Sequence, residues 1–411
     1  MDITPVAPGC HHIQGPQESA LLGCPPEVLK ALLRAKMKVP HVVVLPDIPH
    51  KDGISQMALE FLGYWFLFVE QGFQGGKKFR ILGTKSMCRR LVDILRVTLL
   101  GPTREEMKHW GIGKGRADML VRMSDGMAIK KGNKVLQVED FFEFVHLSDR
   151  EVKEGTPLFA GTDEVKVRRL GGNRFEVTGA DRKQEIDLNF EGEQLPPLVD
   201  LSGEVEKPEK LRVKILGCYS GFDPEGPTTG MVMWVNGNGF LVDVPAGIRR
   251  YLKQVGAAKD QLTAVIQTHV HDDHSSLSEL LISEHALTLI STREIYESAV
   301  LKAARILGES VEMVKSLIKF VEVVPGKTYQ MYGATWEFFY TVHPIPTMGF
   351  RVTVLDEEGK PHVVLHSSDT CHFKALSNLV SEGSVAAPHA ERMRNLVRGD
   401  EALAMLDAGG E

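Results

Sequence analysis

Three histidines and two aspartates stand within residues 269–274, directly after an apolar run. His269 and His271 are two residues apart, so their imidazoles can point into one cavity, and Asp273 and His274 follow at the next turn. Imidazole nitrogen and carboxylate oxygen are suitable ligands for zinc or iron, at about 2.0–2.2 Å. A run of surface histidines at a helix cap is the alternative, but such dense clustering after an apolar strand favours a metal site.

The H-x-H-x-D-H pattern resembles the signature of the metallo-β-lactamase superfamily, and three other segments resemble its companion motifs. LVDVPAG contains Asp243, TVHPIPTMGFRV contains His343, and VVLHSSDT contains Asp369. The resemblance covers roughly residues 211–411. It implies an α/β fold, the αββα metallo-β-lactamase sandwich, for the carboxy-terminal half.

The same resemblance implies ligands for two metal ions. The first ion would be held by three histidines, His269, His271 and His343. The second would be held by three residues, the last of which bridges both ions: Asp273, His274 and Asp369. In the family the residue at Asp243 supports the metal loop rather than binding the ion. His366, three residues before the bridging carboxylate, would be an outer donor, a proton carrier or a buried core histidine.

Such a metal pair implies hydrolytic chemistry. Two ions about 3.5–4 Å apart can share a hydroxide whose pKa is pulled toward neutrality, and can clamp the attacking and the leaving oxygen together. Asp273 could take up a proton as the nucleophile forms, so we expect it to be catalytic. We expect two divalent transition metals and zinc first, with iron or manganese compatible with the same ligands.

The motifs also resemble one branch of the superfamily more than others. Zinc β-lactamases carry Cys where this chain has Asp369, and the oxygen-reducing diiron branch has Glu where it has His271. HPIPTMGFRV and SSDT resemble the ribonuclease Z and phosphodiesterase branch. Only 25 residues separate His343 from Asp369, too few for a tRNA-binding arm. We therefore predict hydrolysis of a small phosphodiester or cyclic nucleotide.

Two alternatives remain open at this point. One is a hydrolase of a thioester, lactone or other ester that uses the same metals. The other is a ligand-binding sensor with a weak metal site. The expected partner in the leading interpretation is a small anionic substrate, and we do not expect nucleic acid as a ligand.

The family pattern ends with one more histidine after a further strand, and this chain offers no obvious equivalent. His372 follows the bridging aspartate too closely, and His389 stands at what looks like a helix start. EALAMLDAGGE reads as a strand running into a glycine loop. We therefore expect the last ligand to be missing because the domain is truncated or ends early, and the second ion to be weakly held.

Length and composition favour two soluble domains. The 411 residues are 43% hydrophobic and 25% charged, with a net charge of −6, an ordinary globular balance. The polar, proline-containing stretch 191–210 predicts a boundary between an α+β domain of unknown role (1–205) and the hydrolase domain (206–411). Helices are predicted near 25–38 and 54–70, and no internal repeat is apparent.

Several features of the sequence bear on the compartment of the protein and on its contacts with other molecules. Five scattered cysteines and no visible signal peptide favour a cytoplasmic protein, and the apolar stretch 61–69, bracketed by Glu60 and Glu70, is too short to cross a membrane. Residues 77–134 hold 15 Lys or Arg against 5 Asp or Glu. This stretch either attracts an anionic ligand or is an ordinary solvated surface. The oligomeric state is left open, a homo-oligomer included.

Overall fold

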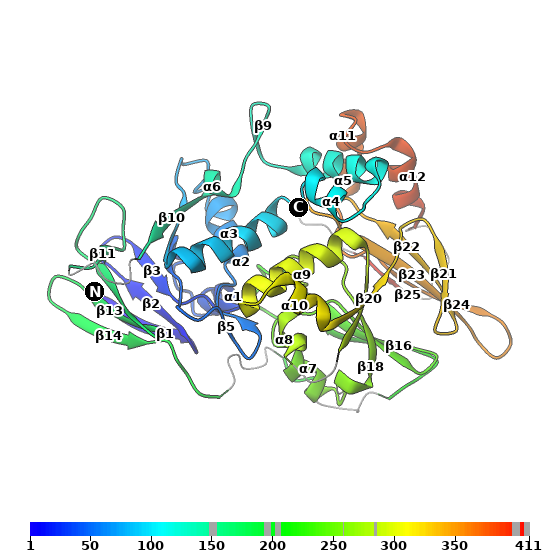
Figure 1. The fold of residues 1–411 in the computed structure, drawn as a ribbon, viewed down its shortest axis with the longest axis horizontal. Coiled ribbons are helices and arrows are strands. Elements are labelled where there is room, and N and C mark those ends of the chain that lie inside the picture. The colour runs from blue at the N-terminus through cyan, green and yellow to red at the C-terminus, as the bar shows by residue number, and fades with distance from the viewer. Residues whose placement is uncertain are drawn as a thin grey trace.

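The structure, a computed structural model, describes residues 1–147, 154–192, 199–201, 207–257, 259–282, 286–396 and 403–406. Most of the expected boundary at 191–210 lies outside the described residues, as does the glycine loop at 407–411. Two bodies of strands and helices stand side by side (Figure 1), one built from each half of the chain. In the described part of the chain no helix is long and apolar enough to cross a membrane.

The carboxy-terminal half begins with a six-stranded sheet. Its order is β15 (Leu211–Gly217), β16 (Gly230–Val235), β17 (Asn238–Val242), β18 (Leu262–Ile266), β19 (Leu287–Ser291) and β20 (Ile318–Glu322). The first three strands are antiparallel neighbours and the last four run parallel. Parallel neighbours need crossover connections, which contain α7 (Ile248–Gln254), α8 (Ser278–Leu281), α9 (Arg293–Leu307) and α10 (Val311–Ser316).

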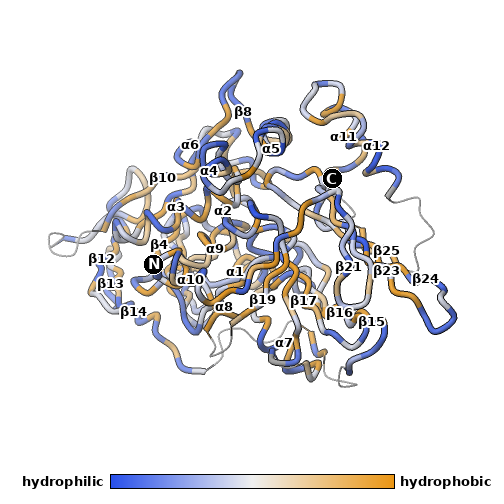
Figure 2. The backbone as a smooth tube through the Cα atoms, turned by 45° about the vertical axis from the view of Figure 1, so that its right-hand side comes forward, coloured by the Kyte–Doolittle hydropathy of each residue, from blue (hydrophilic) through white to orange (hydrophobic). Residues whose placement is uncertain are grey.

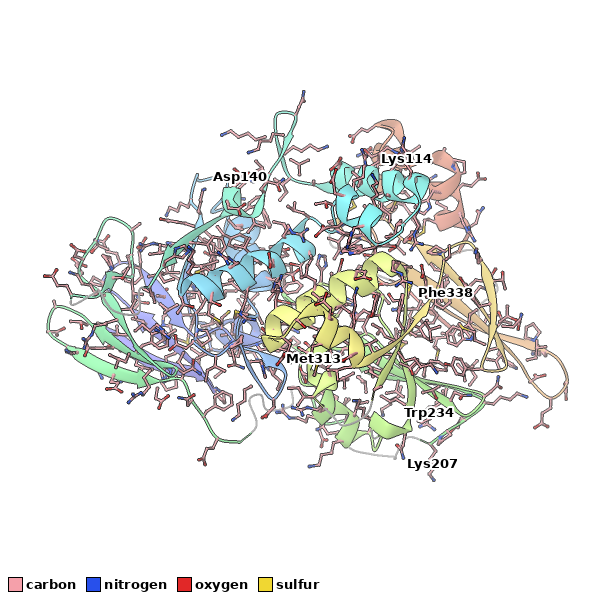
Figure 3. The ribbon with its side chains drawn as sticks, in the orientation of Figure 1. Lys114, Asp140, Lys207, Trp234, Met313 and Phe338 are labelled. Atoms are coloured by element: carbon pink, nitrogen blue, oxygen red, sulfur yellow. The ribbon has the colours of Figure 1, made fainter. Side chains whose placement is uncertain are left out.

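A second sheet packs against the first. It contains β21 (Thr328–Met331), β22 (Ala334–Tyr340), β23 (Met348–Leu355), β24 (Pro361–His366) and β25 (Leu403–Met405). Trp234 and Phe338 belong to facing sheets and share one buried core (Figure 3). Phe339, the next residue along β22, points the other way and packs with α11 (Phe373–Ser381) and α12 (Ala387–Leu396). Helices therefore cover both outer faces, and the predicted αββα sandwich is confirmed.

The amino-terminal half also has two larger sheets, besides the short hairpins at 50–55 and 130–135. The first contains β1 (Asp2–Ala7), β2 (Cys10–Gln14), β3 (Ser19–Leu22), β4 (Val42–Val44), β7 (Phe79–Gly83) and β10 (Phe142–His146). The second contains β11 (Thr156–Pro157), β12 (Lys166–Gly171), β13 (Arg174–Thr178) and β14 (Lys183–Asp187), of which the last three form an antiparallel meander. Val44 and Phe175, from the two sheets, share a buried cluster.

The strand order and directions of this first sheet repeat those of β15–β20: three antiparallel strands followed by three more, all parallel to the third. The junctions match in detail. Gly23 has a φ of 83° and its N–H donates to the Val44 carbonyl at 2.9 Å, while Asp243 has a φ of 57° and its N–H donates to the Ile266 carbonyl at 2.9 Å. The structure therefore shows an internal repeat of topology that is not apparent in the sequence.

Helices repeat in the same places. α1 (Val28–Arg34) matches α7 in length and follows the same strand, and α3 (Lys85–Leu99) matches the 15 residues of α9. α3 and α9 pack against each other where the two halves meet (Figure 1). Different apolar residues can meet the same burial pattern, which explains how one topology occurs twice without visible sequence similarity.

The first copy differs from the second in its extra elements. These are β5 (His50–Lys51), β6 (Ile54–Ser55), α2 (Glu60–Tyr64), a π-helix (Trp65–Val69), α4 (Arg104–His109), α5 (Lys114–Met127), β8 (Lys130–Lys131), β9 (Lys134–Val135) and α6 (Val138–Phe141). α5 packs on the second half through Met123 and Phe339. The β8 hairpin projects as a hydrophilic segment (Figure 2).

The loop after β4 shows why the first copy offers no metal site. Counted along the loop from the last paired residues, Val44 and Ile266, Asp47 takes the position of His269 in the second copy. Its carboxylate forms an ion pair with Arg169 of the second sheet and accepts a hydrogen bond from the Asn173 N–H at 3.2 Å. The guanidinium neutralises this carboxylate, and no group of metal-ligating residues occurs elsewhere in the described part of this half.

Candidate metal centre

The structure brings the six predicted ligands together where strands of the two facing sheets end. Four lie in the loop after β18, one follows β22 and one follows β24. The ligand atoms form two groups, and within each group all of them lie within 4.8 Å of one another. The first group comprises His269, His271, His343 and Asp369, and the second comprises His269, Asp273 and His274.

The orientation of each ring shows which atom faces the centre. Nε2 of His343 lies 3.0 Å from Nδ1 of His271, so these two nitrogens face each other. Asp369 presents one oxygen to each group: Oδ2 lies 3.8 Å from Nε2 of His343, which belongs only to the first group, and Oδ1 lies 3.2 Å from Nε2 of His274, which belongs only to the second. This arrangement suits a carboxylate shared between two ions.

Asp243 fixes the loop after β18, which carries four of the predicted ligands. Its carboxylate accepts hydrogen bonds from the Thr268 N–H at 2.8 Å and hydroxyl at 2.7 Å, and contacts Nδ1 of His274 at 2.8 Å. Because Nδ1 of His274 is occupied there, Nε2 is left to face the centre. Carboxylate partners of this kind fix the ring orientation of metal-ligating histidines. The left-handed φ of Asp243 places its side chain under the loop.

The donor set fits a pair of divalent transition metals. Nε2 of His269 and Oδ1 of Asp273 are buried and have no hydrogen-bond partner within the described ranges. A buried polar group without a partner costs about 1–3 kcal/mol, so such atoms are uncommon unless an ion or water satisfies them. Two acceptors that face a cluster of imidazoles and carboxylates are satisfied by cations with nitrogen and oxygen ligands.

Burial and mutual charge shift the ionisation of these groups in different directions. Burial lowers the pKa of His269 and His271 well below the usual value, so both imidazoles are neutral and able to bind a cation. Burial would also lower the pKa of His274, but Asp369, Asp273 and Asp243 together raise it well above the usual value. Burial raises the pKa of Asp273 to about 6.

Metal binding should therefore release a proton. The raised pKa keeps His274 protonated in the metal-free protein near pH 7, and an imidazole must give up a proton before its nitrogen binds an ion. We expect about one proton per chain to be released from His274 on metal binding, and affinity to fall as the pH falls. Calorimetry of zinc binding in buffers of different ionisation enthalpy measures this number. Zero protons released would contradict the assignment of His274.

The amino-terminal half also reaches this loop. The Thr98 carbonyl lies 2.9 Å from Nε2 of His271, and the Asp272 N–H donates to Oε2 of Glu60 at 3.0 Å. From the other side Lys302 donates to the Val270 carbonyl at 2.8 Å and pairs with Asp272. The sequence carried no spacing signal for Thr98, Glu60 or Lys302, because each belongs to a helix distant from the histidine motif along the chain.

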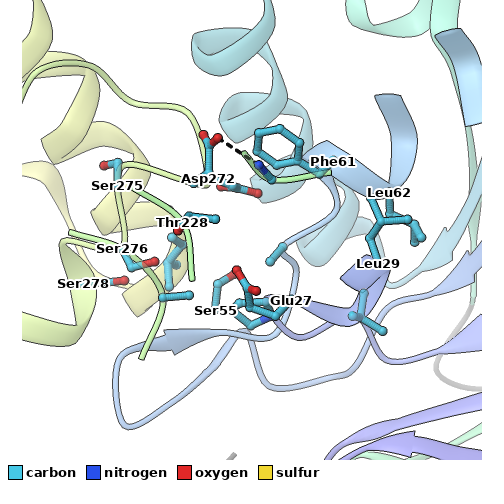
Figure 4. A pocket seen from close by; sticks show the side chains of 17 residues that line it. Glu27, Leu29, Ser55, Phe61, Leu62, Thr228, Asp272, Ser275, Ser276 and Ser278 are labelled. Carbon is cyan, nitrogen blue, oxygen red and sulfur yellow. Dashed lines mark hydrogen bonds between the residues drawn. The ribbon is translucent and has the colours of Figure 1, made fainter. Parts of the chain in front are cut away.

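A small cavity of about 40 Å³ lies at the junction of the halves, beside the loop. Glu27 and Phe61 line it from the first half, and Asp272 and Asp273 from the second (Figure 4). The Gly221 N–H donates to Oδ2 of Asp273 at 3.2 Å, which leaves Oδ1 free to face the centre.

Other predicted residues lie away from the ligand groups. His366 is buried against the Phe350 ring, neither ring nitrogen has a hydrogen-bond partner in the described part of the structure, and burial lowers its pKa to about 4. His372 caps α11 by accepting the Lys374 N–H at 3.1 Å, and His389 lies in α12. Neither joins a ligand group of the described residues. β25 occupies the place of the strand expected in EALAMLDAGGE, alongside β24.

Several cations of the 77–134 stretch are engaged within the fold. Arg96 binds Glu106, Arg104 binds Asp118, and Arg116 binds both Glu294 and the hydroxyl of Tyr340. The last contact joins α5 to the carboxy-terminal half. A role of this stretch in gathering an anionic substrate stays a prediction.

Comparison with known proteins identifies relatives of part of this chain. A family profile described as "Anti-Pycsar protein Apyc1" matches residues 211–385. The cGMP-dependent 3',5'-cGMP phosphodiesterase A of Dictyostelium discoideum is 28% identical over 246 residues, which are 57% of this chain and 28% of that protein. Ribonuclease Z of Mycobacterium sp. (strain KMS) is 29% identical over 191 residues, 42% of this chain and 64% of that one. The chain thus spans only about a quarter of the first relative and under two thirds of the second.

Among solved structures, the short form of human tRNase Z is 14% identical, with 51% of this chain and 95% of that chain covered, at a TM-score of 0.29. The fold assignment rests on the sheets described above. Together with the sequence relatives, these sheets confirm the resemblance to the metallo-β-lactamase superfamily and to its ribonuclease Z and phosphodiesterase branch. The relatives named here are hydrolases.

Proposed function

We propose that this protein is a phosphodiesterase that uses two divalent metal ions, zinc first, to hydrolyse a small phosphodiester such as a cyclic nucleotide. The observation that carries the proposal is the placement of Asp369, whose two oxygens each face one of the two ligand groups. The relatives that are cyclic-nucleotide phosphodiesterases support the substrate class. This chain covers only part of the length of each of these two relatives, so the substrate is part of the proposal.

Each residue of the site has a role in this proposal. Two ions, when bound, would supply Lewis acidity to a phosphoryl oxygen and lower the pKa of water. His269, His271 and His343 would hold one ion, Asp273 and His274 the other, and Asp369 both. Asp273 would also accept a proton from the attacking water. Asp243 keeps His274 oriented throughout.

A substrate panel tests the proposal. The full chain, reconstituted with zinc, iron or manganese, is assayed with 3',5'-cyclic AMP, 3',5'-cyclic GMP, bis(p-nitrophenyl) phosphate, a thioester and a lactone. We expect turnover of at least one phosphodiester, lost on chelation and regained on adding metal, and slower turnover of the other esters.

Three other outcomes would each exclude the proposal and assign the protein to a different class. Faster turnover of the thioester or lactone would assign the protein to the ester hydrolases of this fold. Binding of a cyclic nucleotide without turnover of any substrate, in protein shown to hold two metals, would favour the sensor. Cleavage of precursor tRNA in preference to the small phosphodiesters would place the protein with ribonuclease Z.

A further inference from the structure

The histidines of the second ligand group find their outer hydrogen-bond partners within the carboxy-terminal half, but His271 does not. His274 is oriented by Asp243 at 2.8 Å, and His269 by the Thr268 hydroxyl at 3.1 Å. Nδ1 of His271 faces His343, so its outward nitrogen is Nε2. That nitrogen faces the amino-terminal half.

The atom that meets it is the Thr98 carbonyl, at 2.9 Å. Thr98 lies in the last turn of α3, where carbonyls have no N–H partner inside the helix. The residue four positions on, Pro102, has no N–H to donate. This carbonyl is therefore free to accept from His271. The carboxy-terminal end of α3 also carries partial negative charge, which stabilises a nearby cationic centre.

Glu60 presents a second acceptor to the same nitrogen. Its side chain is fully buried, Oε2 is held by the Asp272 N–H at 3.0 Å, and Oε1 lies 3.7 Å from Nε2 of His271. Oε1 has no hydrogen-bond partner among the residues that the structure describes. The distance of 3.7 Å places this buried oxygen beside the outward nitrogen of His271.

We infer that the amino-terminal copy of the fold, which offers no metal site of its own, acts as a built-in partner that positions His271. The Thr98 carbonyl and Glu60 would together fix the tautomer and orientation in which Nδ1 of His271 binds the first ion. The inference rests on the proposed function. It makes Glu60 a positioning residue supplied across the junction of the two halves, and it gives the amino-terminal half a role at the metal centre.

The test compares metal binding by the full chain and by Glu60→Gln. The amide keeps the size of the side chain and can accept from Asp272, but it then turns an NH2 group toward His271. We expect affinity for Co²⁺ and Zn²⁺ to fall about 10–100-fold, the usual cost of losing an outer partner of a ligand. The visible spectrum of the Co²⁺ protein should change, while the melting temperature of the metal-free protein stays within a few degrees.

Two matched variants separate positioning from packing. Leu59→Val trims a buried apolar side chain next to Glu60, and Glu105→Gln changes an exposed carboxylate on α4, so both should bind metal as the unchanged chain does. Glu60→Asp, which withdraws the carboxyl by one methylene, should weaken binding in the same direction and serves if the glutamine variant does not fold.

Wild-type affinity and spectrum in folded Glu60→Gln, or in folded Glu60→Asp if that variant is needed, would overturn the inference and leave the proposed function standing. Equal losses in Leu59→Val and Glu60→Gln would overturn it too, because they would indicate disturbed packing. Failure of the unchanged chain to bind either metal would instead overturn the proposed function, and this inference with it.

Discussion

Replacing Asp369 with asparagine should remove turnover and release the second metal ion. The carboxylate faces both ligand groups, with one oxygen 3.2 Å from His274 and the other 3.8 Å from His343, so the substitution takes away negative charge and metal spacing together. Loss of an outer partner costs about 10–100-fold, and we expect the loss of this shared ligand to exceed that range. Steady-state rates on the best phosphodiester and elemental analysis of the purified variant measure both effects.

Two further variants test whether this loss is specific to Asp369. Asp181→Asn changes an exposed aspartate of the other half and should retain full activity. His366→Gln should cost less than Asp369→Asn by at least about tenfold, because neither ring nitrogen of His366 has a hydrogen-bond partner in the described structure. Wild-type rates in Asp369→Asn on every substrate would exclude a mechanism that depends on a shared metal ligand.

The double substitution His269→Ala, His271→Ala should remove at least one metal ion of the two. Both side chains belong to the first ligand group, and Nε2 of His269 is a buried atom without a partner among the described residues. Two imidazoles out of four ligands cannot be lost without opening the site to water. Metal content by elemental analysis, together with the melting temperature with and without added zinc, measures the effect.

The matched control is His109→Ala, His146→Ala, which removes two exposed histidines from the first half. It should keep its full metal content, and its melting temperature should still rise on adding zinc by mass action. A full complement of metal in the first double variant, with the fold intact, would show that the ions bind elsewhere.

Local pattern was enough to predict much of the carboxy-terminal half. The alternation and length of the apolar runs predict the strands β15–β18 and β20–β24, because side chains two residues apart face the same side of a sheet; β19 was not predicted. The dense H-x-H-x-D-H motif directly after one of these strands predicted a metal site. A loop that follows a buried strand has few ways to place its side chains, so a short motif there is informative.

The tertiary structure alone decided the role of the amino-terminal half. The repeat of topology follows from strand order and register, such as the matching junctions at Gly23 and Asp243, which apolar periodicity does not encode. Asp47, which counts to the position of His269, pairs with Arg169 of the second sheet, a contact that no local spacing reports.

Glu60 and Thr98 illustrate the same division at the centre itself. In the sequence Glu60 only flanks an apolar stretch, and Thr98 stands inside a helix more than 170 residues before His271. Contacts across such separations depend on how the two halves pack, α3 against α9, and no local spacing reports that packing. The sequence by itself therefore determined which side chains can bind metal, and the packing of the two halves decided which groups hold them in place.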